Sequence, residues 1–263
     1  MKKQFAAILI MSLGSIAFFA CQKSDLKSDG TSEYGVQFEA LNPQFTLPVQ
    51  GTKSALVESD SMSWDSAHLV VSAIKFEAEL KKQDSNEDSI SIEYKWSGPE
   101  MVDLFNNDIT LGNFVLAPGT YDQIELKVEG LQRDAGDVPV FYLEGMYKNN
   151  AGSWPVTVSV SQDVYFKTEK ENVEVTDQGI DITSVIQLYL DQLMADVDPA
   201  DLDNADLTDG VILISADSNA AIYQTIVGNL QHDQRCRYEH KHHGDDHEHK
   251  GSDDDHGDDH DDD

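Results

Sequence analysis

A strict alternation of apolar and polar residues recurs along the middle of this chain and constrains its fold more than any other feature. It is clearest in residues 90–96, 124–128 and 156–160, where a large apolar side chain occupies every second position. Because successive side chains of a strand point to opposite faces of a sheet, this period of two predicts antiparallel strands with one buried face.

Other apolar runs predict further strands around these three. We expect them at residues 34–41, 45–49, 67–80, 138–147, 163–168, 173–177 and 180–188. Turn-forming residues separate several of these strands, at 84–88, 118–119 and 149–152. Many short strands with closely spaced turns predict a mostly β chain, folded as an antiparallel β-sandwich.

Near Ser184 the pattern changes and helices are expected. Apolar residues between 185 and 194 follow a helical spacing that ends around Asp196. A second short helix is expected to start at Asp198, with Pro199 in its first position. Residues 211–214 are apolar and β-branched, which indicates a buried strand.

The last folded element is predicted to be an amphipathic helix. Asp217 or Ser218 can cap it, and one face carries Ile222, Ile226, Val227 and Leu230. We therefore assign residues 34–230 to a sandwich domain with helical elements at its C-terminal end. Residues 231–263 contain almost no apolar side chains and are predicted to form a disordered His/Asp-rich tail.

The first residues have the pattern of a bacterial lipoprotein signal peptide. Two lysines precede the apolar residues 5–16, and the segment ends with Ala20 before Cys21, which resembles a lipobox. We expect residues 1–20 to be removed and the Cys21 thiol to carry lipid. The alternatives are an uncleaved anchor or an ordinary signal peptide, but the polar residues after Cys21 argue against an anchor.

The residues that follow Cys21 point to a tethered protein of the cell envelope. Residues 21–33 are rich in Ser, Asp, Lys and Gly and are predicted to be a flexible tether. Gln22 is not the aspartate that retains lipoproteins in the inner membrane, so an outer-membrane location is favoured, facing the periplasm or the exterior.

Charge and cysteine content exclude two classes of protein. The formal net charge is −31, of which −10 lies from Glu239 onward and −21 in the rest of the chain. Such a surface repels nucleic acid and attracts cations or basic partners. Cys21 and Cys236 are the only cysteines, so a lipidated Cys21 leaves Cys236 without an intrachain partner and excludes a disulfide framework.

Part of the predicted sandwich resembles a known family. The run from about residue 69 to 130 resembles domain of unknown function 4382, through Trp96, residues 102–105, Leu111, Leu116 and the stretch Pro118-Gly119-Thr120-Tyr121-Asp122-Gln123-Ile124. That family consists of secreted or lipid-anchored bacterial proteins with a predicted β-sandwich and no assigned activity. The resemblance therefore implies a fold and a location, and it carries over no catalytic residues.

The tail carries the strongest chemical signal in the sequence. Seven of the nine histidines lie from residue 240 onward, interleaved with aspartates: His240, His242, His243, His247, His249, His256 and His260. Imidazole and carboxylate groups are ligands for divalent Zn, Ni or Cu ions. The tail is therefore either a metal-binding segment or a solvated spacer that binds metal incidentally. Cys236 either adds a thiolate ligand or is a free thiol that can form an intermolecular disulfide.

Two further groups of residues allow a functional and a structural interpretation. The aspartates between residues 198 and 209 lack the spacing of an EF-hand loop, so they form either a looser oxygen site or helix caps and turns. Trp64, Trp96 and Trp154 either line a sugar-binding face or belong to the core.

The sequence contains no recognised catalytic motif. We expect a non-enzymatic, lipid-anchored binding module with a metal-binding tail. The alternatives are a carbohydrate- or protein-binding surface lipoprotein whose tail is only a spacer, and an envelope hydrolase with an unrecognised site. A hydrolase would require converging polar groups in a deep pocket.

Overall fold

The predicted fold class, a mostly β protein with a few short helices, is confirmed. The computed structural model describes residues 31–47, 60–81, 89–106, 109–176 and 182–232. Strands make up 63% of the structure and helices 14%. Gln231 and His232, predicted as the start of the disordered tail, end the last helix instead. The rest of the predicted tail, residues 233–263, lies outside the described residues.

The strands form two sheets. A three-stranded sheet has the order β10-β1-β5, with β1 at Ser32–Leu41, β5 at Leu111–Leu116 and β10 at Ile182–Tyr189. The larger sheet has the order β11-β12-β8-β7-β3-β6-β9, with β2 and β4 also paired to β3. Its strands are β2 (Gln44–Thr46), β3 (Ser61–Lys81), β4 (Ser89–Asp103), β6 (Gly119–Gly130), β7 (Phe141–Asn149), β8 (Gly152–Val160), β9 (Val164–Val175), β11 (Leu207–Thr208) and β12 (Val211–Ile214).

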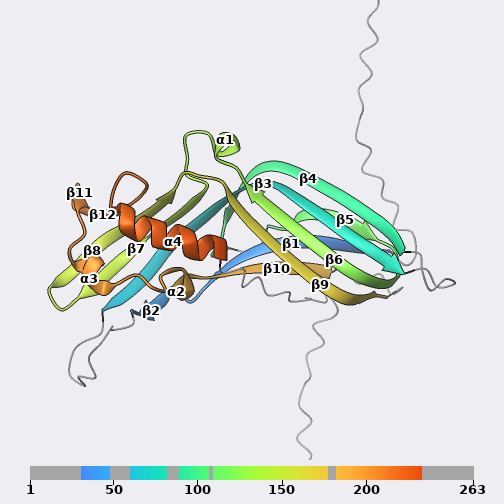
Figure 1. Ribbon diagram of the computed structural model, residues 1–263, viewed down its shortest axis with the longest axis horizontal. Coiled ribbons are helices and arrows are strands. Elements are labelled where there is room, and N and C mark those ends of the chain that lie inside the picture. The colour runs from blue at the N-terminus through green and yellow to red at the C-terminus, as the bar shows by residue number, and fades with distance from the viewer. Residues whose placement is uncertain (1–30, 48–59, 82–88, 107–108, 177–181, 233–263) are drawn as a thin grey trace, which may run out of the picture.

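The long strand β3 connects two halves of an elongated molecule (Figure 1). β3 pairs with β7 up to Leu69 and with β6 from Ala73 onward. It also pairs with β2 at Ser61–Ser63 and with β4 from His68 onward, and the β3–β4 register shifts between Val71 and Ala73. One strand therefore belongs to two differently built ends of the same sheet.

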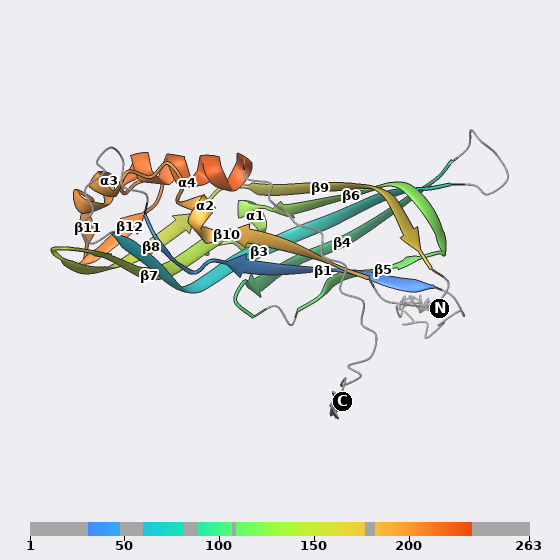
Figure 2. The ribbon, with the colours of Figure 1, turned by 90° about the horizontal axis from the view of Figure 1, so that it is seen from below.

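At one end, strands β4, β3, β6 and β9 face the small sheet as a sandwich (Figure 2). Tyr34 and Phe38 of β1 and Phe76 of β3 are almost fully buried between the sheets. On β6, Ile124, Leu126 and Val128 are buried while the residues between them are partly exposed, as the period of two predicts.

At the other end, helices cover one face of strands β7, β8 and β12 (Figure 2). The covering helices are α2 (Leu190–Leu193), α3 (Pro199–Asp203) and α4 (Ala220–His232). A further short helix, α1 (Gln132–Ala135), lies in the connection between β6 and β7. In α4 the predicted apolar face, Ile222, Ile226, Val227 and Leu230, is buried. Asn229 of α4 donates hydrogen bonds to the carbonyls of Leu193 and Ala195, which ties α4 to the end of α2.

Several predicted boundaries are wrong, each for a tertiary reason. Residues from Ser184 stay in β10 as far as Tyr189, because β10 pairs with β1 in parallel over eight residue pairs. The two strands predicted at 163–168 and 173–177 are one strand, β9, which pairs with β6 along its length despite a polar middle. Asn219, rather than Asp217 or Ser218, directly precedes α4. Two of the pairings, β1 with β10 and β8 with β12, are parallel rather than antiparallel.

Candidate functional site

The residues expected to carry lipid and metal lie outside the described part of the chain. This applies to Cys21, to Cys236 and to all seven tail histidines, His240, His242, His243, His247, His249, His256 and His260. Within the described ranges, no three His, Cys, Asp or Glu side chains gather to hold a metal ion. No helix in those ranges combines the length and apolar character needed to cross a membrane. The lipid site and the metal site therefore stay predictions.

The aspartates between residues 198 and 209 have separate local roles. Asp198 caps α3, because its Oδ1 accepts the amide hydrogen of Ala200 at 2.9 Å. The backbone N–H of Asp206 donates to Asn219 Oδ1, also at 2.9 Å. Asp209 has a φ of 52° in the turn between β11 and β12. The interpretation of this segment as caps and turns agrees with these contacts.

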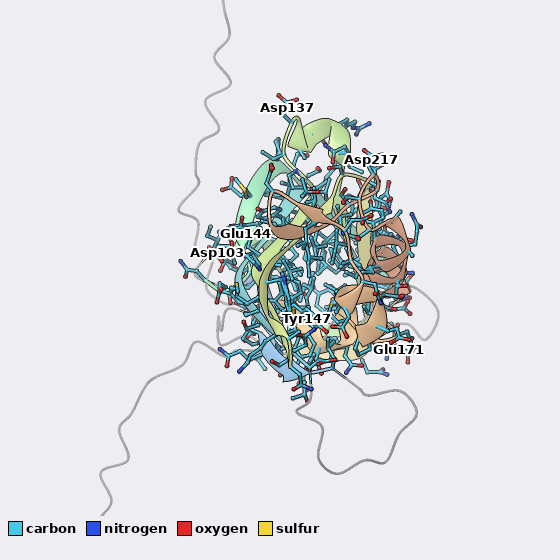
Figure 3. The ribbon with its side chains drawn as sticks, turned by 90° about the vertical axis from the view of Figure 1, so that its left-hand side faces the viewer. Asp103, Asp137, Glu144, Tyr147, Glu171 and Asp217 are labelled. Atoms are coloured by element: carbon cyan, nitrogen blue, oxygen red, sulfur yellow. The ribbon has the colours of Figure 1, made fainter. Side chains whose placement is uncertain are left out.

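A small cavity, here called the Tyr147 cavity, opens where β7, β8 and α3 meet; Figure 3 shows Tyr147 at this end of the molecule. Its volume is about 90 Å³, and its walls include Tyr147, Asn149, Trp154, Leu202, Asp203 and Ile212. The rings of Tyr147 and Trp154 form an aromatic wall, with centroids 6.2 Å apart. Pockets that enclose whole small molecules measure roughly 300–1,000 Å³, so this cavity fits one functional group of a larger partner.

One oxygen of Asp203 is fixed by two donors. The Tyr147 hydroxyl donates to Asp203 Oδ1 at 2.7 Å, and the Asn149 amide donates to the same oxygen. Asn149 is itself fixed, because its Oδ1 accepts the backbone N–H groups of Ala151 and Gly152 at 2.7 and 3.0 Å. No donor within the described residues bonds to Asp203 Oδ2, which leaves that oxygen able to accept from a ligand.

Burial and negative charge determine the protonation of this site. Burial raises the pKa of Tyr147 far above its ordinary value, and the hydrogen bond to Asp203 and the charges of Asp60 and Asp203 raise it further. The Tyr147 hydroxyl therefore stays protonated and acts as a donor. Burial, followed by the charge of Asp203, raises the pKa of Asp60, partly offset by a hydrogen bond from Tyr147. The two carboxylates thus repel each other, and a cation beside them would relieve this repulsion.

The three tryptophans do not form a common face. Trp64 is 3% exposed and belongs to the core. Trp96 on β4 is partly buried against that core, at the sandwich end. Only Trp154 of the three lines the Tyr147 cavity. The core interpretation is therefore right for Trp64, and Trp154 is the one tryptophan placed beside polar groups that could hold a ligand.

A second polar group lies across strands β4, β3 and β7. The Ser66 hydroxyl is 3.0 Å from His68 Nε2, and His68 stands opposite Asp103 on one side and Tyr142 on the other. The Tyr142 hydroxyl donates to Glu144, and Figure 3 shows Glu144 and Asp103 together on one side of the molecule. Burial and the neighbouring Glu144 raise the pKa of Tyr142 to about 12. Tyr142 is therefore neutral at physiological pH, and the group contains two separate hydrogen bonds, Ser66 with His68 and Tyr142 with Glu144.

Sequence reasoning did not find the Tyr147 cavity. Its donor and acceptor, Tyr147 and Asp203, are 56 positions apart, and no short motif links residues at such a distance. The sequence shows the two parts of the site only separately. Tyr147 ends a predicted strand, and a carboxylate-rich segment follows later in the chain. Only the placement of α3 against the end of β7 brings the two together.

No protein-family model, no curated protein sequence and no solved structure matches this chain. The resemblance to domain of unknown function 4382 gains no support from these comparisons and stays a prediction. Inferences about function therefore depend on the residues and geometry of this chain alone.

Proposed function

We propose that this chain is a non-enzymatic, lipid-anchored binding protein of the bacterial cell envelope. Its folded domain would take a positively charged group of a partner in the Tyr147 cavity, and its tail would bind divalent transition metals. The observation that carries the first part is the oriented Asp203 carboxylate, close to Asp60 and beside an aromatic wall.

The cavity chemistry favours an ammonium or guanidinium group. A carboxylate with one oxygen already fixed presents the other in a defined direction, and charge-assisted hydrogen bonds to it are short and strong. The partly exposed ring of Trp154 adds cation–π attraction. The net charge of −31 attracts basic partners over a longer range and speeds their association.

The same chemistry favours binding over catalysis. A general acid or base works best when its pKa lies near the working pH, whereas the pKa of Tyr147 is raised far above it. A cavity of about 90 Å³ also encloses too little of a substrate to position reacting bonds. The proposed role of the cavity is to hold one charged group of a partner.

The proposed position at the envelope follows from the lipid on Cys21. Lipid fixes one end of the chain, and the histidines lie at the other end, so bound metal would be concentrated near the membrane. Protons compete with metal for imidazole, and the neighbouring carboxylates favour the protonated form. Metal binding by the tail is therefore expected to weaken as the pH falls towards about 6.

The cavity is tested by titrating the full chain, in detergent, with a short peptide of arginine and lysine. We expect Asp203→Asn to weaken binding by about tenfold, since it removes one charge-assisted hydrogen bond. Asp201→Asn is the matched control, because Asp201 is an exposed aspartate of the same helix. Equal binding by wild type and Asp203→Asn would contradict the proposal.

The second candidate is a carbohydrate-binding surface protein whose tail is only a spacer, and the position of Trp154 in the cavity wall favours it. A neutral oligosaccharide replaces the peptide in the same titration. Oligosaccharide binding that is insensitive to salt and is lost in Trp154→Ala would support this candidate. Peptide binding that weakens with salt would support the first.

The tail is tested separately with Zn²⁺. The full chain, a chain ending at His232 and a full-length variant with asparagine at the seven tail histidines are titrated side by side. We expect both altered chains to bind fewer ions than the wild type. Equal stoichiometry in all three would remove the metal-binding role and leave the tail as a spacer.

A further inference from the structure

Strand β4 is an exposed edge with an apolar row along it. Among the described strands it pairs with β3 alone, and Figure 1 shows it at the margin of the sheet. The side chains of Ile90, Ile92, Tyr94 and Trp96 alternate along it, yet Ile90 remains 46% exposed and Tyr94 37% exposed. A free strand edge of this kind is a ready template for another strand.

The opposite, outward face of the same sheet carries charges arranged in rows. Register places four lysines side by side across β4, β3, β6 and β9: Lys95, Lys75, Lys127 and Lys167. The neighbouring row contains four glutamates in the same strand order: Glu93, Glu77, Glu125 and Glu169. Like charges directly opposite each other are destabilising, so each row depends on partners of opposite sign.

Within the sheet these partners are present, and at the β4 edge they are not. Lys75, Lys127 and Lys167 each make an ion pair with a glutamate of the sheet, and Glu77, Glu125 and Glu169 each pair with a lysine. Glu93 and Lys95, the edge members of the rows, form no ion pair with any other described residue. Each row thus ends in an unneutralised charge at the free edge.

A second copy of this chain supplies both missing partners in one register. When two β4 strands pair antiparallel about a two-fold axis normal to the sheet, residues of the same face must stand opposite each other. An axis centred on Glu93 places the Glu93 side chains of the two subunits opposite each other, and an axis centred on Lys95 does the same for the two Lys95 side chains, so like charges meet. Centring it on Tyr94 places Glu93 opposite Lys95 of the partner subunit, twice. We therefore propose that this protein forms a homodimer through β4, with the two Tyr94 side chains at the axis.

This register also continues the apolar row of β4 across the axis. It places Ile92 opposite Trp96 of the partner subunit on both sides of the axis, and cross-strand aromatic and aliphatic pairs of this kind stabilise a sheet. Pairing extends from Ile90 to Gly98, and Pro99, which has no N–H to donate, follows directly. The glutamate row of one subunit then continues into the lysine row of the other.

Charge reversal at the edge tests the register. Lys95→Glu and Glu93→Lys each place like charges opposite each other across the axis, so each variant should associate at least about tenfold more weakly than wild type. Within its own chain, Lys95→Glu places a carboxylate opposite Lys75, so weaker association would not reflect a damaged fold. Mixing the two variants restores both opposite-charge pairs and should restore the dimer.

The measurement is the mass of the full chain in detergent, by sedimentation over a range of concentrations. The control is Glu174→Lys, which has the same charge change as Glu93→Lys and lies on β9, opposite Thr120 of β6. We expect a concentration-dependent dimer for wild type and for the Glu174→Lys control, monomers for each edge variant and a heterodimer for their mixture. A wild-type monomer at every concentration would overturn the proposal. So would a dimer that the edge variants leave unchanged.

Discussion

The sheet is covered in different ways at the two ends of β3. At the sandwich end, both faces of the long sheet have a defined partner: the small sheet covers one, and ion pairs among lysines and glutamates cross the other. At the helical end, α3 and α4 cover one face and leave the Tyr147 cavity where they meet the strands. The comparison indicates that the sandwich end supports the fold, whereas the helical end offers a site.

The largest expected effect is a loss of stability caused by a substitution in the core of the sandwich end. Phe76 is fully buried and its ring lies 4.9 Å from Tyr34 and 5.4 Å from Phe114. Phe76→Ala should lower the free energy of unfolding by about 3–5 kcal/mol, because it removes burial and leaves a cavity. Denaturant unfolding measures this. Phe105→Ala, at a position 37% exposed, is the control and should cost at most about 0.5 kcal/mol.

A smaller effect is expected from Tyr147→Phe at the helical end. The change removes one buried hydroxyl and leaves Asp203 with Asn149 as its donor, so unfolding should become about 1–2 kcal/mol easier. Peptide binding should weaken at the same time. Tyr165→Phe, at a site 51% exposed, should change neither quantity. If Tyr147→Phe left both unchanged, the hydroxyl would have no role in shaping the site.

The two ends should also respond to acid with opposite signs. Hydrogen bonds from Lys127 and Lys167 lower the pKa of Glu125 below its ordinary value of 4.5, so its contribution to stability is present above that value and lost as the pH falls through the lowered pKa. Glu125→Gln should flatten the loss of stability in acid, by less than about 1 kcal/mol for a surface pair. Unfolding curves measured between about pH 3 and 7 test this, and an unchanged slope would contradict it.

The contribution of Asp60 to stability should depend on pH with the opposite sign. Burial and the charge of Asp203 raise its pKa above 3.8, so the folded state binds more protons than the unfolded state just above that pH. The unfavourable contribution is present at neutral pH and is relieved as the pH falls through the raised pKa. Asp60→Asn should therefore increase stability slightly at pH 7 and have little effect near pH 3. A loss of stability at pH 7 would show that the carboxylate is needed by the fold.

Within the sandwich end, the sequence predicted the strands whose apolar and polar residues alternate and missed the continuity of β9. Strands with one buried face show their period of two directly, as in residues 124–128 on β6. The polar middle of β9 hides a continuous strand, because its backbone pairing with β6 leaves no pattern in the side chains.

The candidate site could not be predicted from such patterns. Tyr147, Asn149 and Asp203 meet only because α3 packs against the ends of β7 and β8. The same limit applies to β4, whose alternation predicted burial that its edge position leaves incomplete. Periodicity reports which face of an element is apolar, and only tertiary packing decides what covers that face.

The division into a supporting end and a binding end is tested most directly by mapping a bound cation. The full chain is titrated with an arginine- and lysine-containing peptide, and the chemical shifts of backbone amides and tryptophan indoles are followed by NMR. We expect the shifts to concentrate around Tyr147, Asn149, Trp154 and Asp203 and to disappear in Asp203→Asn. Shifts concentrated instead along the glutamate row of the sandwich end, and unaffected by Asp203→Asn, would contradict the assignment.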